Sequence, residues 1–140
     1  VEGCPQEIYV FGGGDGVRIL GSAERFTPRP GRGEGPGGGS WELLPLAAEP
    51  RVSATASAVA GRLFVVGGWH GQQPSASMER FDPLTGIWED MPSMSVARGG
   101  AASATLGGWL YVCGGFDSGM QPLASSERFE AEAGVWEELP

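Results

Sequence analysis

The chain has 140 residues and a formal net charge of −8. Because an acidic chain lacks the basic face that holds a phosphate backbone, we expect no nucleic-acid partner. No run approaches the roughly 18 apolar residues of a membrane-spanning helix, and no basic-then-apolar leader opens the chain, so we expect no membrane partner. The default location is cytoplasmic, with the nucleus as an alternative.

The composition favours short strands and tight turns over helices. The chain carries 25 Gly and 11 Pro, and its apolar runs are short, which is typical of all-β proteins. Cys4 and Cys113 lie far apart in the chain and match neither a disulfide framework nor a metal-ligand spacing. We therefore expect two free thiols, no metal site and no cofactor.

One pattern occurs three times along the chain. A short apolar run ends in Gly-Gly, Glu-Arg-Phe follows, and a Trp then precedes a Pro by four residues. The three Glu-Arg-Phe copies start at Glu24, Glu79 and Glu127, a spacing typical of proteins that build one supersecondary unit per repeat. Because a residue type that recurs in every unit serves the unit, we interpret the repeated residues as structural. They are Gly12, Gly13, Glu24, Arg25, Trp41, Gly67, Gly68, Glu79, Arg80, Trp88, Gly114, Gly115, Glu127, Arg128 and Trp136.

The second copy shows what one unit contains. Four runs of small or apolar residues, separated by turn residues, predict four short antiparallel strands. These runs are residues 53–60, 63–66, 77–82 and 87–91. Residues 69–76, after Gly67-Gly68, read as a polar loop. One such sheet is too small to bury its own faces, so neighbouring copies must cover it, and the repeated Trp are predicted to pack between units.

These residues resemble kelch repeats, the blades of a β-propeller. The resemblance rests on Gly-Gly after an apolar strand, on Glu-Arg-Phe with Asp-Pro-x-x-Gly-x-Trp in the second copy, and on Met-Pro-x-Met leading to Arg98. It implies an all-β, kelch-type propeller segment with three four-stranded antiparallel blades, about half of a six-bladed ring. The predicted blades cover residues 8–46, 51–92 and 98–140.

The first copy departs from this pattern in two ways. Only seven residues precede Ile8, so the resemblance implies that blade 1 lacks its innermost strand, which adaptor-type kelch propellers often receive from the C-terminal end. Residues 27–40 are almost entirely Gly, Pro, Arg and Ser, and we expect them to form a disordered insert. Three blades suggest a fragment or a shortened isoform; the alternative is two chains closing one ring by two-fold symmetry.

The resemblance is greatest to the kelch domains of BTB-kelch adaptors. It implies a protein–protein interaction module that recognises the substrate of a cullin-RING ubiquitin ligase, with the ligase bound through a domain outside this chain. In that family, partners bind the loops between the second and third strands of each blade and the linkers between blades. The loops here are residues 14–22, 69–76 and 116–124, and the linkers are 46–51 and 93–98. The candidate partner-binding residues are Arg18, Arg51, Trp69, His70, Gln72, Arg98, Phe116, Asp117 and Met120.

The chemistry of these side chains suits a protein or peptide partner. The arginines can bind acidic or phosphorylated side chains by bidentate contacts. The aromatic residues and Met120 can supply an apolar pocket. For Arg51 and Arg98 a structural role is an equal alternative, because an Arg stands just before the innermost strand in both visible blades.

Two other classes of function stay open. A kelch scaffold or an actin- or cytoskeleton-binding protein would differ from an adaptor only in what lies outside this chain. Some oxidases of similar fold hold copper with His, Tyr and a modified Cys, but the single His70 and two Tyr in predicted strands do not provide such a set. Asp15 and Asp117 occupy equivalent loop positions and read as solvated loop acids, so we expect no enzyme activity.

Overall fold

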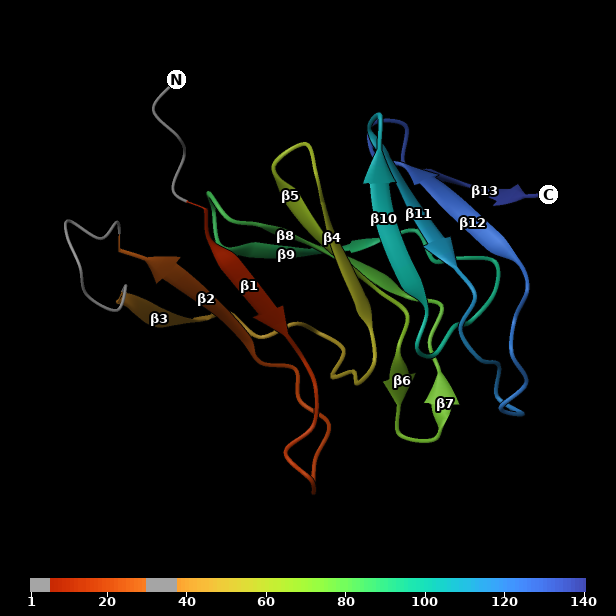
Figure 1. Ribbon diagram of the computed structural model, residues 1–140, viewed down its shortest axis with the longest axis horizontal. Helices are drawn as coiled ribbons and strands as arrows, with labels where there is room; N and C mark the ends of the chain where they lie inside the picture. The colour runs from red at the N-terminus through yellow and green to blue at the C-terminus, as the bar shows by residue number, and fades with distance from the viewer. Residues whose placement is uncertain (1–5, 30–37) are drawn as a thin grey trace.

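The computed structural model describes residues 6–29 and 38–140, and the regular elements in these residues are β-strands (Figure 1). They are β1 (Ile8–Phe11), β2 (Ala23–Pro28), β3 (Gly39–Leu44), β4 (Thr55–Val59), β5 (Arg62–Val66), β6 (Trp69–His70), β7 (Gln73–Pro74), β8 (Met78–Asp82), β9 (Ile87–Met91), β10 (Ala102–Leu106), β11 (Trp109–Cys113), β12 (Ser126–Glu130) and β13 (Val135–Leu139). Within these ranges, no helix is long and apolar enough to cross a membrane.

The strands form three consecutive antiparallel sheets and one small hairpin. The order is β1-β2-β3 in the first sheet, β4-β5-β8-β9 in the second and β10-β11-β12-β13 in the third. The all-β fold of antiparallel blades is as the sequence predicts, and the first sheet has three strands among the described residues. β6 and β7 pair with each other inside the segment that the sequence predicts only as a polar loop.

The β2–β3 hairpin extends into the segment that was predicted to be disordered. Thr27 pairs with Ser40, and Pro28 pairs with Gly39. Pro28 is tolerated because it lies at the last position of its strand, where a missing N–H does little harm. These four residues are therefore strand, and residues 30–37 of the insert lie outside the described residues.

The strand register places the repeated residues in two rows on one face of each sheet, because directly opposed residues of antiparallel strands point to the same side. In blade 2 the rows are Leu63, Phe81 and Trp88, then Val65, Glu79 and Asp90. In blade 3 they are Leu110, Phe129 and Trp136, then Val112, Glu127 and Glu138. In blade 1 they are Ile8, Phe26 and Trp41, then Val10, Glu24 and Leu43.

The core lies between the blades rather than within any one of them. Phe64 of blade 2 packs on Phe129 of blade 3 with ring centroids 5.9 Å apart. Phe11 of blade 1 meets Trp88 of blade 2 edge-on at 5.2 Å. The main buried cluster joins blades 2 and 3 and contains Val59, Phe64, Val66, Met78, Met94, Leu110, Val112 and Phe129. Each small sheet is thus covered by its neighbour, as the size of one repeat requires.

The tryptophan of each of the two later blades also bonds to the blade before it. Trp88 Nε1 donates to the carbonyl oxygen of Pro45 at 2.8 Å, and Trp136 Nε1 donates to that of Pro92 at 2.7 Å. The repeated Trp and Pro therefore form one inter-blade contact. The Trp41 side chain, on the face of blade 1 that points away from blade 2, is largely exposed.

Candidate functional site

The candidate site is the loop face, which we define as residues 14–22, 69–76 and 116–124 with the linkers 46–51 and 93–98. Its three loops extend from the lower edge of the blades, with β6 and β7 in the middle one (Figure 1). Each of the first two loops is tied to the next linker. Gly13 N–H donates to the Arg51 carbonyl and Gly68 N–H to the Arg98 carbonyl, each at 2.9 Å. Backbone bonds therefore fix where each loop leaves the sheet.

Arg51 and Arg98 are buried, which contradicts their predicted role as partner-binding residues. Their side chains are 2% and 0% exposed, and both guanidinium groups bond inside the fold. Arg98 Nη1 donates to the carbonyl oxygens of Gly114 at 2.9 Å and Ser125 at 2.8 Å, while its Nε and Nη2 donate to Glu127. A guanidinium offers five N–H donors in a fixed fork, and here that fork closes the base of a loop. The structural alternative is the correct one for both arginines.

The second blade repeats this arrangement. Arg51 Nη1 donates to the carbonyl oxygens of Gly67 at 2.9 Å and Ser77 at 3.2 Å. Its Nη2 contacts both Glu79 and Glu49, at 2.8 and 3.0 Å. Two carboxylates thus share one buried guanidinium, a geometry that leaves no room for a partner's acidic group.

The two residues of each Glu-Arg pair act separately. Adjacent residues of a strand point to opposite faces, so the Glu faces the preceding blade and the Arg faces the other side. Glu127 accepts a hydrogen bond from the Ser95 N–H at 2.7 Å, in addition to those from the Arg98 guanidinium. Arg128 pairs with Glu137 at 2.7 Å on the exposed outer strand. In blades 2 and 3 the repeated dipeptide is therefore a structural unit whose two ion pairs lie on different faces.

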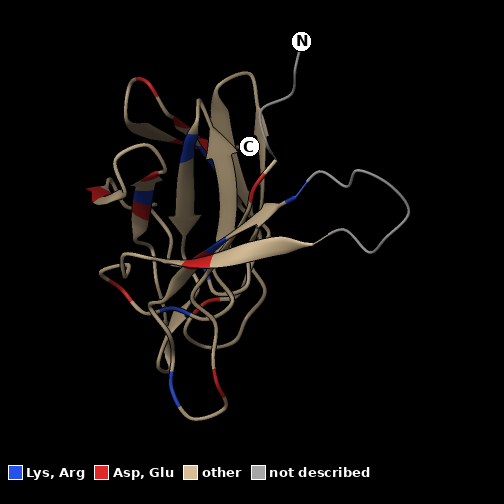
Figure 2. Cartoon of the chain, turned by 90° about the vertical axis from the view of Figure 1, so that its left-hand side faces the viewer, with Lys and Arg blue, Asp and Glu red and all other residues tan. Residues whose placement is uncertain are grey.

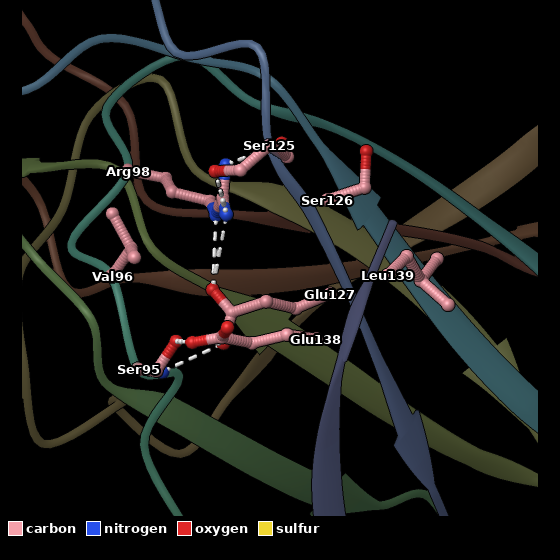
Figure 3. Close-up of a pocket in the computed structure, with 8 residues that line it drawn as sticks. All are labelled: Ser95, Val96, Arg98, Ser125, Ser126, Glu127, Glu138 and Leu139. Atoms are coloured by element: carbon pink, nitrogen blue, oxygen red, sulfur yellow. Dashed lines mark hydrogen bonds and ion pairs between the residues drawn. The ribbon is translucent and has the colours of Figure 1, made fainter.

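A cavity of about 140 Å³ opens beside Arg98 on the loop face (Figure 3). It is lined by Ser95, Val96, Arg98, Ser125, Ser126, Glu127, Glu138 and Leu139. The Ser95 hydroxyl lies 2.9 Å from Glu127 and 3.0 Å from Glu138. In blade 2 the residue equivalent to Val96 is Glu49, and its carboxylate bonds to Arg51, Ser75 and Ser77. Blade 3 has no carboxylate at this position and has the serine-lined cavity there instead, so the two repeats differ at this place.

Among the predicted partner-binding residues, Arg18, His70, Gln72, Phe116 and Met120 have exposed side chains. The Nδ1 atom of His70 lies 2.9 Å from the carbonyl oxygen of Pro50. Because a carbonyl oxygen only accepts, Nδ1 must carry the proton, which leaves Nε2 of a neutral ring as an acceptor for a ligand. Phe116 and Met120 expose apolar surface on the third loop.

Trp69 is half-buried, because its indole lies against Gly99, directly after the second linker. A side chain on Gly99 would overlap the Trp69 ring, so only glycine fits at this position. Gly99 also pairs with the third loop, since its N–H donates to the Phe116 carbonyl at 3.0 Å. Gly99 thus holds Trp69 and Phe116 near each other. Sequence reasoning missed this glycine, although the Gly-Gly pair directly after Arg98 was a visible signal.

Both loop aspartates stabilise turns rather than standing free. Asp117 Oδ1 accepts the N–H groups of Gly119 at 2.8 Å and Gln121 at 2.9 Å. Asp15 Oδ1 accepts those of Arg18 at 2.7 Å and Val17 at 2.9 Å. The bond from the Arg18 backbone, followed by that from Val17, lowers the pKa of Asp15 because both favour the ionised form. We infer that Asp117 shapes its loop through Oδ1. If Asp117 also contacts a partner, as predicted, it must do so through its second carboxylate oxygen.

The loop face is not basic, because Arg51 and Arg98 are buried and do not contribute to its surface. Arg18 is the exposed arginine left among the three predicted ones. Basic and acidic segments are interspersed along the chain, without a continuous blue area in the view of Figure 2. The described residues contain no group of three or more His, Cys, Asp and Glu side chains placed to hold a metal ion.

Consecutive sheets of three or four antiparallel strands, joined by Trp–carbonyl bonds and clamped by buried arginines, define a β-propeller built from repeated blades. The kelch motif matches residues 50–95 and 97–140, so the chain belongs to the kelch-repeat family. Kelch domains in general bind proteins.

Comparisons with two known proteins show how far the similarity extends. Over 51 residues the chain is 37% identical to the human protein named Kelch repeat and BTB domain-containing protein 13, covering 36% of this chain and 11% of that protein. The solved structure of YjhT matches with a TM-score of 0.72 at 15% identity, covering 91% of this chain and 49% of that one. The chain therefore spans about half of the structure it resembles and a small part of the curated relative.

Proposed function

We propose that this chain is the substrate-recognition part of a kelch-type adaptor for a cullin-RING ubiquitin ligase, acting by binding rather than catalysis. The observation that carries the proposal is a rigid framework that presents an exposed, chemically varied loop face. Loops on a fixed scaffold are where binding residues concentrate. The similarity to a protein with kelch repeats and a BTB domain supports the adaptor role, with the ligase contacted outside this chain.

The exposed side chains indicate the kind of partner. Phe116 and Met120 offer an apolar contact, while His70 and Gln72 offer hydrogen bonds. Arg18 supplies one exposed guanidinium, which pairs well with a single carboxylate. We infer a peptide segment that has an apolar anchor and one acidic side chain, rather than the highly acidic or multiply phosphorylated partner that three free arginines would have favoured.

Replacing Arg18, His70 and Phe116 together by alanine tests this face. We expect the variant to lose partner capture in cells while its melting temperature stays at the wild-type value, because all three side chains are exposed. The matched control replaces Leu84 and Glu132, which lie in turns, and Leu106, the last residue of β10. All three lie at the opposite ends of the strands, and the control should keep the partners. A loop variant that melts early, or that keeps its partners, would contradict the proposal.

The ligase role needs a second readout with the intact protein. Partners that depend on the loop face should accumulate when cullin neddylation is blocked, and the loop variant should remove that accumulation. Partners that are captured but keep constant levels would indicate a scaffold or cytoskeletal role instead.

A further inference from the structure

The cavity beside Arg98 has an occupied counterpart in blade 2. The two sites correspond residue by residue, because Arg51 and Arg98 each hold the two carbonyl oxygens at the base of a loop through Nη1. Glu49 lies two residues before Arg51, and Val96 lies two residues before Arg98. Blade 2 therefore places a carboxylate where blade 3 has only an aliphatic side chain.

In blade 2 the Glu49 carboxylate completes the site. Its Oε2 accepts hydrogen bonds from Arg51 Nη2 at 3.0 Å and from the Ser75 hydroxyl at 3.3 Å, and the Ser77 hydroxyl bonds to the same oxygen. Arg51 Nη2 also donates to Glu79 at 2.8 Å. One nitrogen of a buried guanidinium thus serves two carboxylates, while the rest of the group holds the base of the loop.

In blade 3 the same donors face a cavity (Figure 3). Val96 has no carboxylate, and Arg98 Nη2 donates instead to the Ser125 hydroxyl oxygen at 2.8 Å. Ser125 is the counterpart of Ser77, because the arginine of each blade holds its carbonyl oxygen. Since the Ser125 hydroxyl accepts this bond, its own hydrogen is left for an acceptor in the cavity. The space of about 140 Å³ holds a group of several atoms, because one water molecule needs only about 10–15 Å³.

We propose that this cavity binds a carboxylate group of a partner, in the place that Glu49 holds in blade 2. Arg98 Nη2 and the Ser125 hydroxyl donate to the carboxylate, while Arg98 Nη1 keeps its bonds at the base of the loop. The cavity lies on the loop face, so the carboxylate belongs to an acidic side chain of the bound peptide, in addition to the one that pairs with Arg18. This source rests on the proposed function, whereas the preference for a carboxylate follows from the two blades.

The charges around the cavity are compatible with a carboxylate. Glu127 and Glu138 line it together with one guanidinium, which on charge alone would favour an ammonium group. Blade 2 has the same surroundings, because Glu79 and Asp90 occupy the corresponding register positions. Glu49 is nevertheless held there by charge-assisted hydrogen bonds. Blade 2 therefore shows that the arginine and the serines outweigh the two acids.

The cavity would stay open if a further blade followed blade 3. Glu127 and Glu138 lie on the face of blade 3 that is turned to blade 2, whereas a further blade would pack on the opposite face. The linker after blade 2, residues 93–98, shows the path of the chain. Its N–H groups bond to the carbonyl oxygens of Ser75 and Ala76, and none of its residues hydrogen-bonds to the second carboxylate of the blade-2 site.

NMR spectroscopy of the full chain tests the ligand class directly. The probe is acetyl-glutamate amide, with acetyl-glutamine amide as the neutral control and methylammonium as the competing cation. We expect the glutamate probe to shift the signals of the Arg98 Nε–H and the Val96 amide until they saturate. The glutamine probe should bind at least roughly tenfold more weakly, because it lacks the charge. Methylammonium should leave these signals in place, and Arg18→Ala should not change the result.

Val96→Glu fills the cavity from within the chain. It recreates the arrangement of Glu49, so the variant should melt at or above the wild-type temperature and lose binding of the glutamate probe. Val96→Thr, which has nearly the same size and no carboxylate, is the matched control and should keep binding. Ser125→Ala leaves the cavity open and removes one donor to a charged group, which should weaken probe binding roughly tenfold.

Partner capture in cells separates this inference from the proposed function. Val96→Glu should reduce capture and Val96→Thr should not. The alanine variant at Arg18, His70 and Phe116 leaves the cavity intact, so it should still bind the glutamate probe after capture is lost. If that variant keeps its partners, the proposed function fails while the probe results still decide the ligand class.

Four results would overturn the inference. They are the absence of saturable shifts with the glutamate probe, shifts of the same signals by methylammonium, probe binding that survives Val96→Glu, and partner capture that a folded Val96→Glu variant leaves unchanged.

Discussion

Removing the guanidinium of Arg98 should strongly destabilise the fold. Arg98→Met takes away five hydrogen bonds and leaves the Glu127 carboxylate buried, with only Ser95 to satisfy it. Removing one member of a buried ion pair costs about 3–5 kcal/mol. The whole folding free energy of a domain is about 5–15 kcal/mol, so the loss is a large share.

Urea unfolding followed by tryptophan fluorescence measures this loss. With a dependence on urea of about 1–3 kcal/mol per molar, the midpoint should fall by roughly 1–5 M. Adding Glu127→Gln to Arg98→Met should recover part of the loss, because the uncompensated charge is gone. Glu89→Gln, in the exposed Arg80–Glu89 pair, is the control and should change stability by less than about 1 kcal/mol. An Arg98→Met variant within about 1 kcal/mol of wild type would refute the structural role and restore Arg98 as a candidate contact.

Three further outcomes follow from single contacts. Gly99→Ala should displace the Trp69 indole, destabilise the fold by about 1–3 kcal/mol and shift the tryptophan fluorescence; an unchanged spectrum would contradict the overlap. Trp88→Ala should cost about 2–3 kcal/mol in a thermal melt, less than for a fully buried aromatic, because the ring is half-exposed; a loss under about 1 kcal/mol would show that its contacts are dispensable. Burial and the hydrogen bond to Glu7 raise the pKa of Tyr9 above 10.0, so folding favours the protonated phenol. Its contribution to stability is complete below pH 10.0 and is lost as the pH rises through the higher folded-state value. The difference in tyrosinate absorbance between wild type and Tyr9→Phe should titrate with a midpoint above pH 10.0. A midpoint at or below 10.0 would be inconsistent with the raised pKa.

The blades were predictable because their pattern is periodic and local. Gly-Gly, Glu-Arg-Phe and the Trp recur at fixed places, and each strand is short enough for its turn residues to mark both ends. The direction of a side chain is harder to predict. Glu79 and Arg80 are adjacent, yet one is buried under a neighbouring blade and the other is paired on an exposed strand. Only the register of the assembled sheet distinguishes these roles.

The positions of the loops were predictable from the sequence, but the surroundings of their side chains were not. Arginine is a residue type that often binds partners, and Arg51 and Arg98 lie in linkers between blades. The sequence contains no sign that their carboxylate partners lie 28 and 29 residues further on. Long-range pairs of this kind arise from the packing of whole blades. Ser53 is a similar case, since it adopts a positive φ of 51° where the third blade has Gly100.

The buried arginines explain how a repeat can keep its fold while its loops differ. The Nη1 group of Arg98 holds the two carbonyl oxygens, of Gly114 and Ser125, between which the third loop leaves and re-enters the sheet. Arg51 holds the equivalent pair in blade 2. Because the clamp acts on backbone atoms at the base of the loop, it does not depend on the sequence in between. Stability is therefore set by the framework of each blade, and the exposed side chains of the loops, where we propose that partners bind, can differ without loss of the fold.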